Sequence, residues 1–416
     1  MRQLLLCIFL LTCSAALQAH GTEPTGATPE DSPLGVWEAW LESPGGKIPF
    51  ELDVMTSPQR ELEVALRSGG ETTRVPVVRF EPNELLLEFV HYDSRIRATW
   101  NREGKSLDGE WSKRAGLEKW SRLEFHARRP RSGADRSDKI VSVAGRWAVD
   151  FSSEELPAVG IFEMQENQSH VRGTFLTAKG DYRYLAGRTF DDGSLELSCF
   201  DGAHAFLFKA KLQDDGTLAG DFWSRDTWHE TWTARRDETA ALPDPMRLTR
   251  WQEAVSLEAL RFPDPDGRVW SLADPALAGK ARIIEVFGTW CPNCNDATRY
   301  FVELQERFGS RGLSIVALAF ELTGDFERDA AQVQRYREYH GIEYPILVAG
   351  LSDKKEAAQA FPALDRVLAF PTTIFLDAAG NARAIYTGFS GPATGPAYDR
   401  LRQQFESLIE EILSES

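Results

Sequence analysis

Two cysteines of this chain stand three positions apart, in the run Trp290-Cys291-Pro292-Asn293-Cys294. The run follows an apolar stretch typical of a strand and opens a helical pattern, which predicts the first thiol at a helix amino terminus. Unpaired backbone amides and the helix dipole favour a thiolate at such a position. The second thiol, one turn deeper, could attack a mixed disulfide formed by the first. The spacing therefore predicts thiol–disulfide exchange by Cys291 and Cys294.

The alternative use of such a pair is one half of a zinc site. Zinc needs two further cysteine or histidine ligands, and the sequence has neither a second Cys-x-x-Cys nor a pair of histidines at the spacing of zinc ligands. We therefore predict no metal and no other cofactor. Pro292 would lie in the first helical turn, where it costs no hydrogen bond and its ring fits the helical φ angle.

A carboxylate lies six positions before the first cysteine, in the apolar run Ile283-Ile284-Glu285-Val286-Phe287. In a strand covered on both faces Glu285 would be desolvated, which raises the pKa of a carboxyl group towards neutrality. Such a group could take the proton of Cys294 as that thiol attacks. The alternative is a hydrogen-bonded glutamate at a sheet end that takes no part in the chemistry.

These residues belong to a region, 262–416, in which strands and helices alternate. The continuous apolar run at 313–320 is typical of a strand inside a parallel sheet. Apolar residues recur at helical spacing in 300–308 and near the end of the chain, and a further helix is expected over about 328–340. Segments 373–376 and 384–386 predict a strand pair. The region is expected to be an α/β sandwich.

Three motifs of this region resemble the TlpA/ResA-like branch of the thioredoxin superfamily. They are Phe262-Pro263-Asp264-Pro265-Asp266-Gly267, the strand ending Phe287-Gly288-Thr289-Trp290-Cys291, and Phe370-Pro371-Thr372-Thr373-Ile374-Phe375. The resemblance covers about residues 262–413 and implies a thioredoxin fold, an extracytoplasmic location and reduction of partner disulfides. It also implies that Pro371 is a cis-proline facing the cysteine pair, beside a substrate groove. The residues expected at that groove are Trp290, Pro292, Phe370 and Thr372.

Two positions depart from the pattern of that family. Many members carry an acid in the helix after the motif, where this chain has Ala297. Glu285 instead matches the buried acid of thioredoxins themselves, so we assign it the proton transfer. Phe370 is bulkier than the β-branched residue often found before the cis-proline, so the substrate preferences of the family do not carry over directly.

Residues 34–129 and 143–237 predict two all-β domains of related sequence. Short alternating runs are broken by Gly, Asp, Asn and Pro, and Gly35-Val36-Trp37 returns as Gly145-Arg146-Trp147. A period of about 110 residues indicates two tandem antiparallel barrels or sandwiches. A linker at 130–139 would join them. Residues 243–261 predict a second linker, with a short helix from Met246 to Leu257.

Residues 1–19 have the pattern of a cleaved secretory signal: a positive start, an apolar core and a small-residue end. We expect export, most simply to the periplasm, with a lipid anchor on Cys13 as the alternative. Cleavage would leave Cys199 besides the dithiol pair, too few cysteines for a framework of structural disulfides. Alternation places Cys199 on the apolar face of its strand, which predicts a buried, inert thiol.

The formal net charge of −16 argues against a nucleic-acid partner, because phosphates are bound by clustered Lys and Arg. The expected partners are protein disulfides or dithiols and a thiol electron donor in the membrane or periplasm. A second hypothesis is a binding or scaffold protein of the cell envelope. In that case the β-domains would recognise a partner and the redox domain would be accessory.

Overall fold

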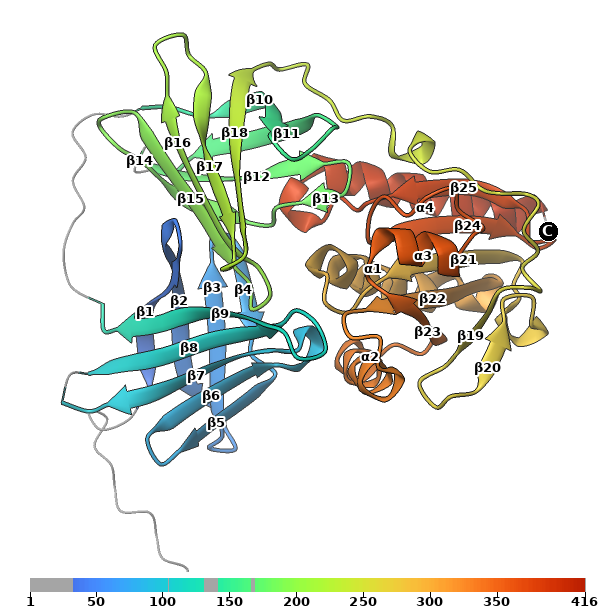
Figure 1. Ribbon diagram of the computed structural model, residues 1–416, viewed down its shortest axis with the longest axis horizontal. Coiled ribbons are helices and arrows are strands. Elements are labelled where there is room, and N and C mark those ends of the chain that lie inside the picture. Colours follow the sequence, from blue (N-terminus) through green and yellow to red (C-terminus); the bar gives the residue numbers. More distant parts are fainter. Residues whose placement is uncertain (1–32, 104, 131–140, 166–168, 416) are drawn as a thin grey trace, which may run out of the picture. The chain divides into compact units, whose positions relative to one another are not determined.

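The structure is a computed structural model that describes residues 33–103, 105–130, 141–165 and 169–415 (Figure 1). The predicted signal at 1–19 and nearly all of the predicted linker at 130–139 lie outside these residues. Over the part that is described, no helix combines the length and the apolar character needed to cross a bilayer.

The first part of the chain forms a nine-stranded sheet in the order β4-β3-β2-β1-β9-β8-β7-β6-β5. Strands that are adjacent in this order pair antiparallel, and β1 pairs with both β2 and β9. Along β1 alternate side chains are buried, as a half-buried strand requires. The elements are β1 (Gly35–Ser43), β2 (Gly46–Thr56), β3 (Leu62–Ser68), β4 (Glu71–Arg74), β5 (Val77–Glu81), β6 (Glu84–Phe89), the 3-10 turn η2 (Val90–Tyr92), β7 (Ser94–Asn101), β8 (Ser106–Arg114) and β9 (Trp120–Arg128).

The second part forms another nine-stranded antiparallel sheet, in the order β11-β10-β18-β17-β16-β15-β14-β12-β13. An additional pairing of β11 with β12 closes this sheet into a ring, so it is a barrel. Its strands are β10 (Gly145–Phe151), β11 (Ala158–Met164), β12 (His170–Thr177), β13 (Gly180–Asp181), β14 (Leu185–Thr189), β15 (Ser194–Phe200), β16 (Ala205–Leu212), β17 (Leu218–Ser224) and β18 (Trp228–Arg236).

The repeated sequence segments occupy equivalent places in the two sheets. Gly35 and Gly145 begin β1 and β10 with φ angles of 104° and 123°, a conformation that glycine adopts without a steric penalty. The Arg129 guanidinium lies 3.9 Å from the ring centroid of Trp37, and Arg236 lies 4.5 Å from that of Trp147. The prediction of a duplicated all-β region is confirmed.

The segment that joins the β region to the rest of the chain does not contain the helix predicted from Met246 to Leu257. Only the 3-10 turn η3 (Pro245–Arg247) forms there. Trp251 makes an isolated antiparallel bridge with Leu364, and the amide of Gln252 donates to the carbonyl of Ala363 at 2.8 Å. Backbone groups that a helix would use internally pair with a distant segment, so tertiary contacts override a weak helical preference.

The last part of the chain is an α/β fold built on a five-stranded sheet in the order β23-β22-β21-β24-β25. Strands β21, β22 and β23 are parallel, and β24 and β25 are antiparallel to their neighbours. The predicted thioredoxin fold is confirmed. The elements are β19 (Arg261–Pro263), β20 (Val269–Ser271), η4 (Pro275–Leu277), β21 (Ala281–Phe287), α1 (Pro292–Phe308), η5 (Gly309–Arg311), β22 (Leu313–Glu321), α2 (Phe326–His340), β23 (Ile346–Leu351), α3 (Lys354–Ala360), β24 (Thr372–Asp377), β25 (Ala382–Thr387), η6 (Pro392–Thr394) and α4 (Pro396–Glu415).

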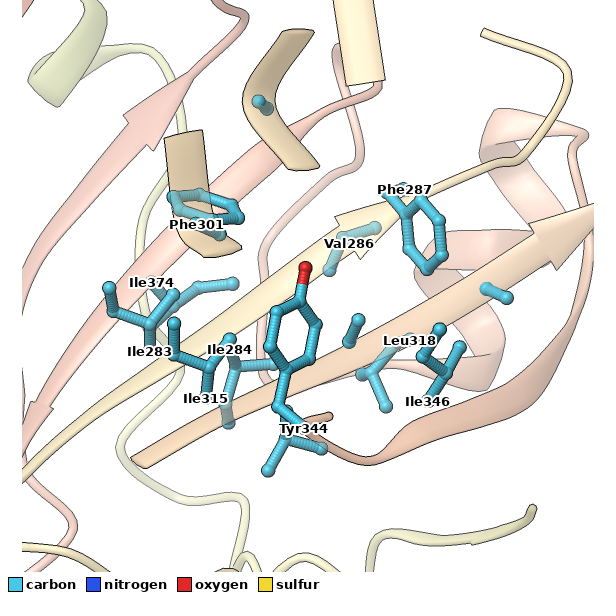
Figure 2. Packing of buried hydrophobic residues seen from close by; sticks show 14 of the residues in the cluster. Ile283, Ile284, Val286, Phe287, Phe301, Ile315, Leu318, Tyr344, Ile346 and Ile374 are labelled. Atoms are coloured by element: carbon cyan, nitrogen blue, oxygen red, sulfur yellow. The ribbon is translucent and has the colours of Figure 1, made fainter. Parts of the chain in front are cut away.

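Strand β21 lies at the centre of this sheet and is buried along its whole length. Figure 2 shows its side chains packed with residues of the neighbouring strands β22 and β24 and with Phe301 of α1. Each large aliphatic side chain removed from water stabilises the fold by roughly 1.5–3 kcal/mol. This core fixes the end of β21, from which the dithiol segment continues.

Candidate active site

Helix α1 begins directly at the cysteine pair. Cys291 is its N-cap residue, and the Cys291 Sγ accepts a hydrogen bond from the backbone amide of Cys294 at 3.4 Å. The Cys291 thiol also donates to the carbonyl oxygen of Phe370 at 3.4 Å. Pro292 occupies the first helical position, as predicted. Both cysteines are free thiols; Cys294 is fully buried and Cys291 retains 7% of its surface.

The local environment shifts the pKa values of the two thiols in opposite directions. Burial alone would raise the pKa of Cys291, but hydrogen bonds from Cys294 and from the Asn293 amide, together with the charge of Lys113, lower it overall. The pKa of Cys294 is raised well above its ordinary value by burial, by Cys291 and by Glu285. Because the thiolate is the nucleophile, the lowered pKa of Cys291 and the raised pKa of Cys294 favour Cys291 as the attacking thiol.

Glu285 lies inside the sheet at zero exposure, paired in register with Ala317 of β22 and Thr373 of β24. Among the residues of known placement, neither carboxyl oxygen has a hydrogen-bond partner. Burial, followed by the charge of Cys291, raises the pKa of Glu285 well above its ordinary value. The alternative of a hydrogen-bonded glutamate at a sheet end does not describe this residue. The charge of Glu285 also contributes to the raised pKa of Cys294.

The residues expected at the substrate groove gather around the thiols but differ in exposure. The Phe370–Pro371 peptide bond is cis. The Trp290 indole is half-buried, donates to the Phe320 carbonyl at 2.9 Å and lies 5.6 Å from the Phe370 ring. Thr372 is fully buried and its hydroxyl donates to a backbone carbonyl of its own loop, so it does not present a surface to a substrate.

Residues of both β-sheets form hydrogen bonds with the dithiol segment, and the sequence did not predict these contacts. The Lys113 ammonium, from β8, donates to the Trp290 carbonyl at 3.1 Å. The Asn293 side chain donates to the carbonyl of Asp181, in β13, at 3.3 Å. A signal for Lys113 was present, since it shares the inward phase of its strand with the buried Trp111.

A buried arginine joins three parts of the chain next to α1. The Arg183 side chain is 3% exposed and forms ion pairs with Glu71 of β4, with Asp201 after β15, and with Asp296 of α1. The Arg183–Glu71 contact measures 2.6 Å and the Arg183–Asp201 contact 3.3 Å. Burial raises the pKa of Glu71 to about 7 against the opposing charge of Arg183. In the resolved ranges no group of three or more His, Cys, Asp or Glu is arranged to hold a metal ion.

The last third of the chain is similar to known proteins. The model of the AhpC/TSA family matches residues 252–385. The thiol-disulfide oxidoreductase ResA of Geobacillus thermodenitrificans is 26% identical over 125 residues, which cover 30% of this chain and 63% of the relative. ResA of Bacillus subtilis is 25% identical over 125 residues, covering 30% and 62%. This part of the chain is a thioredoxin-like domain homologous to ResA, and the chain spans a little under two thirds of these relatives.

A solved structure of a thioredoxin-family thiol:disulfide interchange protein from Chlorobium tepidum is also similar. It is 27% identical, and the match covers 39% of this chain and 99% of that one with a TM-score of 0.29.

Proposed function

We propose that this protein is an exported thiol–disulfide oxidoreductase that reduces disulfides of extracytoplasmic proteins through Cys291 and Cys294. The observation that carries the proposal is the pair of thiols at the start of α1, one with a lowered and one with a raised pKa. The match of residues 252–385 to the AhpC/TSA family and the similarity of 125 residues of this chain to ResA support the same chemistry. The secretory pattern of residues 1–19 supports export, and the periplasm is the simplest destination.

The first half of the reaction forms a mixed disulfide. The Cys291 thiolate attacks one sulfur of the substrate disulfide, whose S–S bond breaks and whose other sulfur leaves as a thiolate. The hydrogen bonds that the helix amino terminus gives to the Cys291 sulfur favour the thiolate before the attack.

The second half releases the substrate. Glu285 takes the proton of Cys294, the resulting thiolate attacks the Cys291 sulfur, and the second substrate sulfur leaves. The substrate gains two electrons and two protons, and the protein is left with a Cys291–Cys294 disulfide. A thiol donor in the membrane or periplasm would return the electrons by the reverse exchange.

The test is reduction of a protein disulfide by the full chain. With a small dithiol as electron source, the protein should reduce insulin, and Cys291→Ser should abolish the reaction. Cys199→Ala is the matched control and should retain it, because Cys199 lies in the core of the second sheet. A wild-type chain that forms no more free thiol than the dithiol alone would contradict the proposal. That result would favour the scaffold hypothesis instead.

A further inference from the structure

Lys113 is a buried lysine of the first β-sheet that contacts the dithiol segment. It stands near the end of β8 and is 4% exposed. Its ammonium donates to the carbonyls of Trp290, at 3.1 Å, and Tyr92, at 3.4 Å, and lies 5.2 Å from the Tyr92 ring centroid. Buried lysines are almost always paired with an anion. In the described portion of the chain, its hydrogen bonds go to carbonyl oxygens rather than to a carboxylate.

Charged groups from several segments of the chain act on Lys113. Burial is the largest influence and lowers the pKa of Lys113 to about 7, with a further lowering from Arg225. Asp201, Asp93 and Cys291 act in the opposite direction. The other titratable neighbours that respond to its charge are His91, His204 and Glu321.

Of these groups, Cys291 is the one whose negative charge the reaction needs. Lys113 holds the carbonyl of Trp290, the residue bonded to Cys291, so the ammonium is fixed close to the reacting sulfur. Attraction between two charges is mutual: a nearby cation favours the thiolate, and the thiolate favours the protonated amine.

Contacts between the first sheet and α2 hold Lys113 in this position. The Gln332 side chain donates to the carbonyls of Val90 and His91, at 3.2 and 3.0 Å. Asp93 forms ion pairs with Arg328 of α2 and with Arg114, the neighbour of Lys113 in β8. The end of β8 is therefore anchored to the thioredoxin-like domain beside the dithiol.

We propose that Lys113 is a positioning residue of the dithiol site, contributed by the first β-sheet, whose ammonium orients the Trp290 carbonyl and stabilises the Cys291 thiolate. The inference rests on the proposed function and extends it. The β region would then be part of the redox centre rather than a separate binding module, and it would set the pH range in which the protein reacts.

The test is the pH dependence of Cys291 alkylation in a Cys294→Ser background, where Cys199 is buried and Cys291 is the reactive thiol. Lys113→Met removes the charge and keeps a long apolar stem. The pKa of Cys291 should rise by about one unit, so its alkylation by iodoacetamide at pH 5–6 should slow about tenfold. Lys119→Met, at an exposed position of the same sheet region, is the matched control and should leave the profile unchanged. An unshifted profile in a folded Lys113→Met protein would overturn the proposal.

A second measurement uses the lysine unchanged and does not depend on the variant folding. The ratio of Cys291 alkylation rates with iodoacetate and iodoacetamide should exceed the ratio for glutathione, because a nearby cation attracts the anionic reagent. A ratio at or below that of glutathione would contradict the proposal. Insulin reduction by the wild type tests the proposed function separately from the role of Lys113. If the wild type reduces insulin but Lys113→Met does not shift the pH dependence of Cys291 alkylation, the proposed function stands and the role of Lys113 is contradicted.

Discussion

Replacing Glu285 tests whether the buried carboxyl group is the proton acceptor for Cys294. The side chain is fully buried, neither oxygen has a hydrogen-bond partner among the described residues, and burial raises its pKa well above the ordinary value of 4.5. Glu285→Gln keeps the shape of the side chain and removes its titration. The change should therefore alter both the pH dependence of stability and the release of substrate.

The expected stability effect follows from the proton that the folded chain retains. Above about pH 4.5 the unfolded chain loses the Glu285 proton, while the folded chain keeps it until the pH passes the raised pKa. Across that window the contribution of Glu285 to the free energy of unfolding falls by about 1.4 kcal/mol per pH unit. Glu285→Gln lacks this term, so its stability relative to the wild type should rise with pH by about 1.4 kcal/mol per pH unit across that window.

The assay is urea unfolding of both proteins at several pH values between 5 and 8, with both cysteines reduced. The difference between the two curves isolates Glu285 from the other buried carboxyl groups, such as Glu321, whose pKa burial raises to about 7. Rapid-mixing kinetics on the same proteins should show resolution of the mixed disulfide slowed about 10²-fold. Formation of the mixed disulfide by Cys291 should change much less.

Parallel stability curves for wild type and Glu285→Gln would refute the reasoning, because they would mean that Glu285 has the same protonation state folded and unfolded. The stability curves could also diverge while the mixed disulfide is resolved at the wild-type rate. In that case Glu285 would be a buried acid without a part in the chemistry, and another group would accept the Cys294 proton.

Two further changes test the parts of the structure around the site. Arg183→Met removes the cation that Glu71, Asp201 and Asp296 share and should lower the free energy of unfolding by about 3–5 kcal/mol in urea at pH 7; a loss below about 1 kcal/mol would show that the network is not formed in solution. Cys199→Ala empties part of the core of the second sheet and should cost about 1 kcal/mol of stability while insulin reduction stays unchanged. A large loss of activity at full stability would make Cys199 a redox participant.

Local sequence patterns were sufficient to predict the thioredoxin-like domain and its dithiol. The apolar run of β21 marks a strand covered on both faces, and the isolated carboxylate within it stands out for the same reason. The period-two alternation and repeated glycine and tryptophan positions predicted the duplicated β region. Pairing of β11 with β12, which makes the second sheet a barrel, depends on tertiary contacts that alternation does not encode.

The environment of the dithiol could not be predicted in the same way, because it is assembled from distant polar residues. Lys113 and Trp290 are separated by 177 positions, and Arg183 and Asp296 by 113. Lys113, Arg183 and Asp296 are charged, so each of them, taken alone, is expected at the surface. The helix predicted from Met246 to Leu257 failed for a related reason, since that segment's backbone pairs with a distant segment at Leu364.

The most direct test of the central claim is to trap the mixed disulfide. The reduced full chain carrying Cys294→Ser should be incubated with an oxidised protein substrate, and the linked peptide mapped by mass spectrometry. We predict a mixed disulfide on Cys291, while the matched variant Cys291→Ser, with Cys294 intact and fully buried, should form none. A mixed disulfide on Cys199, or none on either variant, would contradict the account.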